Sequence, residues 1–348
     1  MLGITRFVLA LLVLLSHANG LDLSINLGVV AVIIFYFTSG YLMRCSYGRF
    51  VSHSNQPIRD FYLDRLLKLL PQYGLVVLVS FAAIAWLGPA QQVWLMNQQP
   101  ALDKVLLNLA LLPANYVFAP LTIEAMLPHP IVPPAWSLAA ELQFYLLLPW
   151  ICLLPRKGFL TLLALSASIQ IGALFFASGP FNSDNFGYRF IFGVLTFFLF
   201  GGLYASHEAA FQRQLARLIW LVYALLLLVI APSCGLFEHP HVLEVLLGAV
   251  LAWPLLAAAL HSRPREVWLK QADSLLGRLA YPIFIAHYLA FYLCEKLFGL
   301  TSGQQAAYLP VALLLCLGIA YGLVRLQDLI EAYRLQRRGF ASMAQGAT

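Results

Sequence analysis

The chain is a succession of long apolar segments separated by short polar ones. Most segments are close to the roughly 20 residues that a helix needs to cross a membrane. They are continuous, whereas strands of a membrane β-barrel alternate apolar and polar residues. The pattern therefore predicts an all-α, polytopic membrane helix bundle with about ten transmembrane helices. The predicted helices are Ile4–Ala18, Ile25–Met43, Leu66–Leu87, Ala135–Leu154, Phe159–Ala177, Phe190–Tyr204, Leu218–Cys234, Val242–Leu260, Leu279–Leu297 and Ala306–Val324.

Composition supports the membrane class and limits the partners. Of 348 residues, 61% are hydrophobic and 10% are charged, against about a quarter charged in soluble domains. The net charge of +6 forms no basic stripe, so we expect the lipid bilayer and no nucleic acid as a partner. The five cysteines are widely scattered and indicate neither a metal site nor a disulfide framework. Glu238, His239 and His241 could ligate a metal, but a solvated loop is the simpler interpretation and we predict no metal.

The positions of the basic residues predict the orientation. An even number of crossings puts both termini on one side, and Lys and Arg concentrate in cytoplasmic loops. All 21 Lys and Arg residues except Lys104, Arg189 and Lys296 fall on the side of the termini. We therefore expect a multi-pass protein of the cell (inner or plasma) membrane with both termini cytoplasmic. Residues 1–330 would form the transmembrane domain and residues 331–348 a cytoplasmic C-terminal tail.

Two segments leave room for interpretation. The longest external connection, Gly88–Pro134, contains Trp94, several glutamines and many prolines, and we expect a re-entrant or lid-like cap. Met1–Gly20 is predicted as the first helix, but it also resembles a secretory signal peptide, with Arg6 before an apolar stretch and a small-x-small site ending at Ala18. Charge bias does not separate these two alternatives.

Three ionisable residues are predicted inside the spans: His17, Glu141 and His287. Such groups are costly in a membrane and commonly functional. The rise of a helix puts all three in one layer about 10 Å thick. Arg6 lies eleven residues before His17 and shares its helix face. The plainer alternatives are a histidine bonded to a backbone carbonyl or a tyrosine, and a carboxylate that pairs with Arg or His.

A cationic rim is predicted at the cytoplasmic interface. Arg65 and Lys68, three residues apart, share one helical face. Together with Arg6 and Arg59 they suit a phosphorylated cytosolic ligand. Plain positive-inside topology with lipid headgroup contacts is the alternative.

Five short segments, in order along the chain, match a known pattern. They are Arg6 with His17; Phe35-Tyr36-Phe37-Thr38-Ser39-Gly40-Tyr41-Leu42; the basic segment Arg65 to Tyr73; Trp136-Ser137-Leu138 with Glu141, Phe144 and Tyr145; and Tyr281-Pro282-Ile283-Phe284 with His287. Over nearly its whole length the chain thus resembles the acyltransferase-3 family of integral membrane acyltransferases. It departs from the family pattern at Lys68, where arginine is usual, and at Tyr36 and Pro282. The resemblance favours a retained first helix, and we expect no fused esterase-like domain.

The resemblance implies an O-acyltransferase that moves an acyl group, usually acetyl, from cytosolic acyl-CoA to a hydroxyl of a cell-envelope glycan or lipid-linked sugar. Acyl-CoA would be a co-substrate, with no permanently bound cofactor. We predict His17 as general base and Glu141 as the carboxylate that orients its ring; a transient acyl-His17 is the alternative. The predicted acyl-CoA contacts are Arg6, Arg65, Lys68 and Tyr73, and the predicted substrate contacts are Tyr41, Trp136, Ser137 and His287.

Other functional classes compete with the enzyme. Ten spans with His and Glu at membrane depth also describe a proton-coupled secondary transporter. Transporters usually contain internal repeats, and we find no convincing similarity between the two halves. A membrane scaffold would leave Glu141 unexplained.

Overall fold

The computed structural model describes residues 1–18, 24–91, 93, 96, 98–117, 120–127, 129–205, 209–262, 266–302 and 305–345. These residues form helices and connecting turns, with no strand among them. The helices are α1 (Leu2–His17), α2 (Leu27–His53), α3 (Pro57–Leu87), α4 (Leu102–Leu109), α5 (Ala135–Leu153), α6 (Arg156–Ala173), α7 (Ile191–Tyr204), α8 (Ala209–Leu225), α9 (Ala231–Ser233), α10 (Val242–His261), α11 (Val267–Phe298) and α12 (Tyr308–Gln345), and the short turns are η2 (Leu112–Asn115), η3 (Glu124–Met126), η4 (Asn185–Arg189), η5 (Leu226–Ile230) and η6 (Leu236–Glu238).

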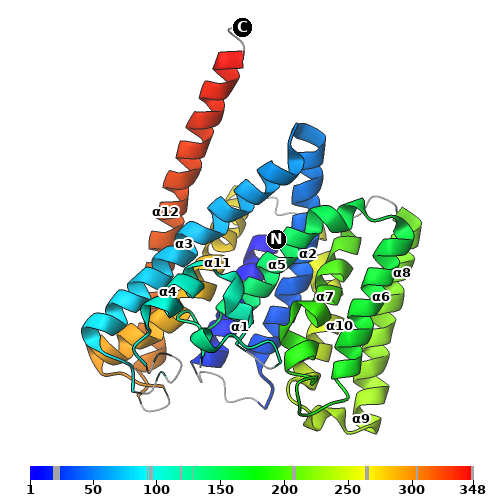
Figure 1. Cartoon of the computed structure of the whole chain (residues 1–348), viewed down its shortest axis with the longest axis horizontal. Coiled ribbons are helices and arrows are strands. Elements are labelled where there is room, and N and C mark those ends of the chain that lie inside the picture. The colour runs from blue at the N-terminus through cyan, green and yellow to red at the C-terminus, as the bar shows by residue number, and fades with distance from the viewer. Residues whose placement is uncertain are drawn as a thin grey trace.

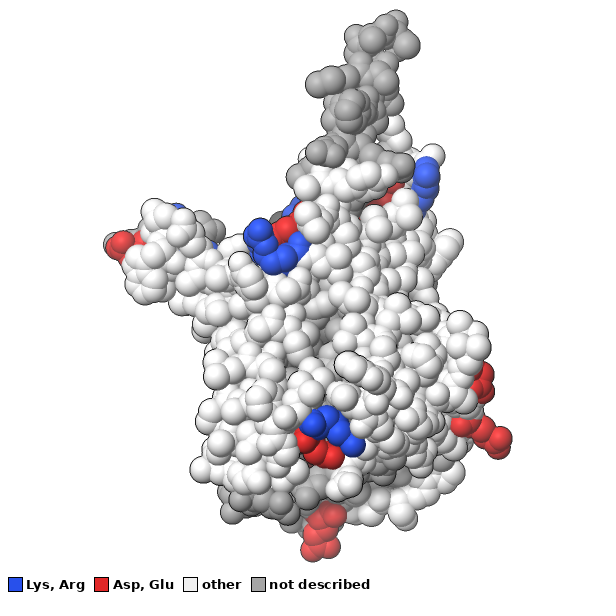
Figure 2. All heavy atoms as spheres, turned by 90° about the vertical axis from the view of Figure 1, so that its left-hand side faces the viewer, with Lys and Arg blue, Asp and Glu red and all other residues white. Residues whose placement is uncertain are grey.

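Eight of the described helical segments are long and apolar enough to cross a membrane. They comprise α2, α3, α5, α10 and α11, η4 with α7, α8 continued through α9, and the first part of α12. The apolar α1, with 16 residues, is shorter. Figure 2 shows a band of surface without charged side chains between two charged groups, as a lipid-facing surface requires. The all-α membrane bundle is therefore confirmed, while the count of ten spans stays a prediction.

Helices α1 and α2 lie at the centre of the bundle (Figure 1). Helix α1 packs against α11 and α2, and α2 packs in turn against α7 and α10. Helices α3, α11 and α12 lie on one side of this pair, and α6, α7, α8 and α10 on the other. Leu9, Ala10, Val13 and Leu14 of α1 are all buried. The N-terminal segment is thus an integral part of the bundle.

Glycine allows the backbones of α2 and α7 to touch. A Cβ atom on Gly40 would lie 2.0 Å from the carbonyl oxygen of Phe198, and one on Gly201 would lie 1.8 Å from that of Phe37. Small residues at helix crossings permit this close approach in membranes, where packing replaces the hydrophobic driving force. The crossing places Ser39, next to Gly40, at the centre of the molecule.

Several helices extend beyond their apolar segments at the same end of the bundle, which we call the basic end. The hydropathy pattern predicted only the apolar turns of these helices, because polar turns that continue the same helix carry no apolar signal. Arg278 and Arg325 of this end both pair with Asp328. Helix α12 crosses the predicted boundary at residue 330, so the expected tail is helical as far as Gln345. The added turns are residues 44–53 of α2, 57–65 of α3, 267–278 of α11 and 325–345 of α12.

The connection from Gly88 to Pro134, the cap, lies at the opposite end and contains α4, η2 and η3. The carboxylate of Glu295 accepts the backbone N–H groups of Gln91 at 2.5 Å and Val93 at 3.1 Å. The buried apolar residues of the cap belong to the two hydrophobic clusters that the spanning helices form. The cap is therefore anchored to the bundle and is no separate core; Trp94 lies outside the described residues.

The α2–α7 crossing generates a stability prediction. We expect Gly201→Ala to destabilise the protein by about 1 to 3 kcal/mol, because the new methyl group forces two backbones apart. The control is Gly318→Ala in α12, where a Cβ meets nothing within 4 Å and helix propensity improves. Thermal unfolding in detergent measures both. Equal melting temperatures for the two variants would contradict the close crossing.

Candidate active site

Three cavities lie one after another along the centre of the bundle. The basic cavity, about 440 Å³, is lined by side chains that include Arg6, Arg65 and Glu141. The loop cavity, about 500 Å³, is bordered by the cap and by the loop after α11. A central cavity of about 90 Å³ lies between them and shares wall residues with both. The shared residues are Val32, Ser137 and Phe284 towards the basic cavity, and His17, Pro134, Trp136 and Arg189 towards the loop cavity.

His17, the last residue of α1, lines the central and loop cavities. Its Nδ1 atom lies 3.2 Å from Nε2 of His287 on α11. The two rings are stacked, with centroids 5.2 Å apart and planes inclined by 12°. His287 itself is fully buried. His287 therefore contacts the His17 ring and lines none of the three cavities, so the structure does not place it where it would touch a substrate.

The hydrogen-bond partners assign the protons on these two neutral rings. Nδ1 of His287 lies 3.3 Å from the carbonyl oxygen of Ile283, which can only accept, so Nδ1 carries the proton and Nε2 is an acceptor. Nδ1 of His17 must then donate to His287. The Nε2 atom of His17 is left with its lone pair, which is the state that a general base requires.

Glu141 has different partners from those predicted. Its carboxylate accepts hydrogen bonds from the hydroxyl of Ser39 and, at 2.5 Å, from that of Tyr145. It lines the basic cavity, which does not include His17. The prediction that Glu141 orients the His17 ring is thus wrong, because Glu141 points to the other side of the Ser137 and Phe284 wall. Sequence spacing gave the depth of Glu141 but not the direction of its side chain.

Three of the four residues of the predicted cationic rim line the basic cavity; the fourth, Arg59, does not and instead donates to Gln56. Arg6, Arg65 and Lys68 line it, as do Arg49 and Arg278. An acidic residue that the prediction overlooked, Asp64, pairs with Arg65 and lies 3.3 Å from Lys68. Among the described residues, Nε of Arg65 has no hydrogen-bond partner although it is buried. This orphaned donor fits a site for an anionic group such as phosphate.

The other predicted contacts divide between the cavities and the core. Trp136 and Ser137 line the central cavity, as expected for substrate contacts. Tyr73 is fully buried and Gln72 lines the basic cavity in its place. Tyr41 packs edge to face on Tyr204, 6.0 Å away, and lines none of the three cavities. The structure therefore does not bring Tyr73 or Tyr41 to the site, because their turns of helix face neighbouring helices.

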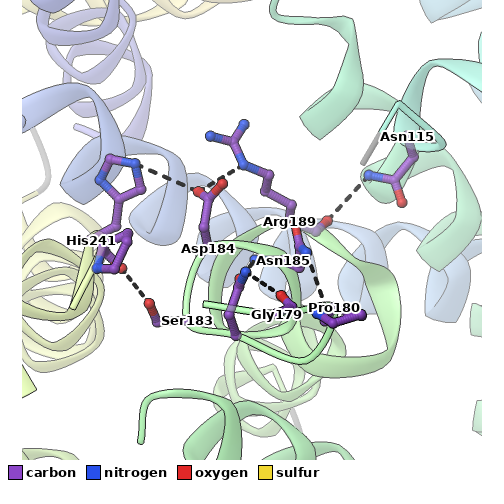
Figure 3. Close-up of polar contacts among 10 residues, drawn as sticks. Asn115, Gly179, Pro180, Ser183, Asp184, Asn185, Arg189 and His241 are labelled. Atoms are coloured by element: carbon purple, nitrogen blue, oxygen red, sulfur yellow. Dashed lines mark hydrogen bonds and ion pairs between the residues drawn. The ribbon is translucent and has the colours of Figure 1, made fainter. Parts of the chain in front are cut away.

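Arg189 is a site residue that sequence analysis missed. Its Nε donates to Asp184 at 2.8 Å, and its terminal nitrogens point away from that carboxylate (Figure 3). The guanidinium carbon lies 4.7 Å from the Trp136 ring centre and 5.0 Å from that of Tyr188. This carboxylate and these rings hold the charge beside His17, in the wall of both the central and loop cavities. The sequence did contain a sign of its role, since Arg189 is one of only three Lys and Arg residues that fall on the side opposite to the termini.

The histidines of the predicted Glu238-containing loop are engaged elsewhere. Nδ1 of His239 bonds to the carbonyl oxygen of Leu174 at 2.8 Å, and Nε2 of His241 lies 3.6 Å from Asp184. Within the described residues no group of three or more potential ligands could hold a metal ion. Burial lowers the pKa of His241 below its ordinary value, Asp184 opposes this shift and Arg189 adds to it. At neutral pH the His241 ring is therefore uncharged, and the ion pair of Asp184 is with Arg189.

The Asp184 contact generates a titration prediction. In Asp184→Asn the group that raises the pKa of His241 is lost while burial remains, so His241 should titrate at a lower pH than in the wild type. Histidine-labelled NMR across a pH series measures the change. A higher pKa for His241 would contradict the arrangement.

Comparisons with known proteins agree with this architecture. The family model Acyl_transf_3, described as an acyltransferase domain, matches residues 2–325. An uncharacterized protein of Aquifex aeolicus (strain VF5) is 34% identical over 177 residues, which cover 47% of this chain and 72% of that protein. No solved structure matches the chain. The match over nearly the whole chain favours an enzyme over the carrier that its composition also allowed. The protein belongs to the acyltransferase-3 family and is a multi-pass membrane O-acyltransferase.

Proposed function

We propose that the protein transfers an acyl group, acetyl by preference, from acyl-CoA in the basic cavity to a hydroxyl of a cell-envelope glycan or lipid-linked sugar in the loop cavity. The observation that carries this proposal is the row of three cavities, with His17 in the wall where the central and loop cavities meet. Such a row allows two substrates to approach one residue from opposite ends. We place the termini in the cytoplasm of a cell whose inner or plasma membrane holds the protein.

The donor side matches a coenzyme. Coenzyme A carries phosphates at one end and a thioester at the other, and the basic cavity offers cations at its rim. Arg65 can offer its unpartnered Nε and Lys68 its ammonium group, with Asp64 holding both in place. The pantetheine arm would then extend past Glu141 towards Ser137 and Phe284, the wall shared with the central cavity. Glu141 thus stays a predicted site residue, on the donor side.

Catalysis would follow from the tautomer of His17. Its Nε2 lone pair takes the proton of the acceptor hydroxyl while the hydroxyl oxygen attacks the thioester carbonyl carbon. The C–S bond breaks, the ester forms, and the thiolate of coenzyme A receives the proton from His17. His287 stabilises the charged ring only through Nε2, which accepts from Nδ1 of His17. An acyl group carried on His17 is the alternative path.

The acceptor side is aromatic and polar together. Trp136, Tyr288, Phe291 and Tyr308 line the loop cavity. Aromatic faces with a few fixed polar groups are typical of sites for organic ligands. Arg189 beside His17 supplies a charge at the reacting end, where it could stabilise the oxyanion of the tetrahedral intermediate.

The histidine pair generates the first functional prediction. We expect His17→Ala to lower kcat by about 10²- to 10⁴-fold. His287→Leu should also lower kcat while the KM for acyl-CoA stays unchanged, because His287 acts through His17. His287→Gln, whose side-chain oxygen can still accept from His17, should retain more activity than His287→Leu. Release of coenzyme A in the presence of a glycan acceptor measures all three; equal activities of the Gln and Leu variants would contradict the orienting role.

The basic cavity generates the second functional prediction. Arg65→Gln or Lys68→Gln should raise the KM for acyl-CoA at least tenfold, with a much smaller effect on the KM for the acceptor, because a phosphate contact is lost. Lys270→Gln is the matched control, since Lys270 is exposed on α11 and does not line the cavity. The same rise in both KM values, or in the control, would contradict donor binding at this rim.

A further inference from the structure

A fourth cavity lies beside the proposed reaction path and is not part of it. This side cavity has a volume of about 570 Å³ and is enclosed by α2, α5, α6, α7 and α8. It shares no lining residue with the basic, central or loop cavities. Its wall includes Gly40 and Phe144, the chain neighbours of Ser39 and Tyr145. It therefore lies directly behind the residues that hold Glu141.

The wall of the side cavity is apolar except for two arginines. Phe144, Phe198 and Leu199 are typical of the apolar part, and Arg44 and Arg156 supply the charge. Both arginines belong to basic-end turns: Arg44 to the extension of α2 and Arg156 to the first turn of α6. The cavity therefore has an apolar body and a cationic end.

Neither arginine has a carboxylate partner among the described side chains. Nη1 of Arg44 donates to Sγ of Cys152 at 3.0 Å, and sulfur is a weak acceptor. The guanidinium carbon of Arg156 lies 3.4 Å from the centre of the Phe211 ring. No Asp or Glu in the described part of the chain comes within ion-pair distance of either residue. Two charges that share a cavity and have no acidic partner among the described side chains are suited to an external anion.

The cavity also reaches an apolar part of the surface. Leu154, one of its lining residues, is 40% exposed, and the nearby Leu153 is 67% exposed. A ligand could therefore enter sideways from the bilayer. A free phosphate would satisfy the arginines but leave the aromatic wall bare, whereas an amphiphile fills both parts.

We infer that the side cavity binds an anionic membrane phospholipid, with its phosphate at Arg44 and Arg156 and an acyl chain along Phe144, Phe198 and Leu199. Planar guanidinium groups bind phosphate oxygens with two parallel hydrogen bonds, and anionic lipids are attracted to basic residues at the membrane surface. The bound lipid supports α2 and α5 where they carry Ser39, Glu141 and Tyr145. This inference is independent of the acyl donor and acceptor.

Native mass spectrometry of delipidated protein tests it, with phosphatidylglycerol or phosphatidylcholine added in detergent. We expect the wild type to bind phosphatidylglycerol at least tenfold more tightly than phosphatidylcholine, and the double variant Arg44→Gln/Arg156→Gln to lose this preference. Lys157→Gln is the matched control, since Lys157 is exposed, adjacent and outside the cavity. Equal binding of the two lipids, or an equal loss in the control, would overturn the site.

A second measurement needs no variant. Cys152 lines the side cavity, so phosphatidylglycerol should slow its alkylation by a maleimide several-fold, measured on the Cys152 peptide. Cys234, exposed at the far end of α9, is the internal control and should react at the same rate with and without lipid. Protection of Cys152 by inorganic phosphate alone would show a simple anion site, and no protection by lipid would leave the cavity without its occupant; either result overturns the inference.

Discussion

Ionisable and polar side chains are costly inside a membrane span unless they are paired, and the groups at the centre of this bundle are paired within the protein. This constraint explains the three polar groups of the bundle interior. Ser39 and Tyr145 supply hydroxyls to Glu141, His17 pairs with His287, and Arg189 is held by Asp184. The first two groups join helices that are distant in sequence, and the pair Asp184 and Arg189 lies in the connection between α6 and α7. These polar residues tie the centre of the bundle together.

The close crossing of α2 and α7 supports this arrangement. Gly40 and Gly201 let the two backbones meet, and a larger residue at either position would separate them. Ser39 is the residue before Gly40, so its distance from Glu141 depends on that crossing. The short segment Ser39–Gly40 thus both permits the close helix crossing and places a polar side chain beside Glu141. Its Gly40 also lines the side cavity.

Charge is distributed along the row of cavities. The basic cavity gathers cations around Asp64, whereas Arg189 carries the charge beside His17 in the wall shared by the central and loop cavities. A phosphate-bearing donor and a neutral or weakly polar acceptor would each meet a different environment. Val32, Ser137 and Phe284 lie where the basic cavity adjoins the central cavity.

The sequence by itself determined the class of fold, the apolar helical segments, the places of His17, Glu141 and His287 along their helices, and most of the basic rim. These follow from periodicity, helix rise and charge, which are local properties of the chain. The tertiary structure alone decided which polar residues meet, because side-chain direction depends on how helices rotate against their neighbours. Helix packing gave His17 the partner His287 in place of Glu141, buried Tyr73 and packed the half-buried Tyr41 against Tyr204. It also brought Arg189 to the site from a turn that no periodic pattern marks.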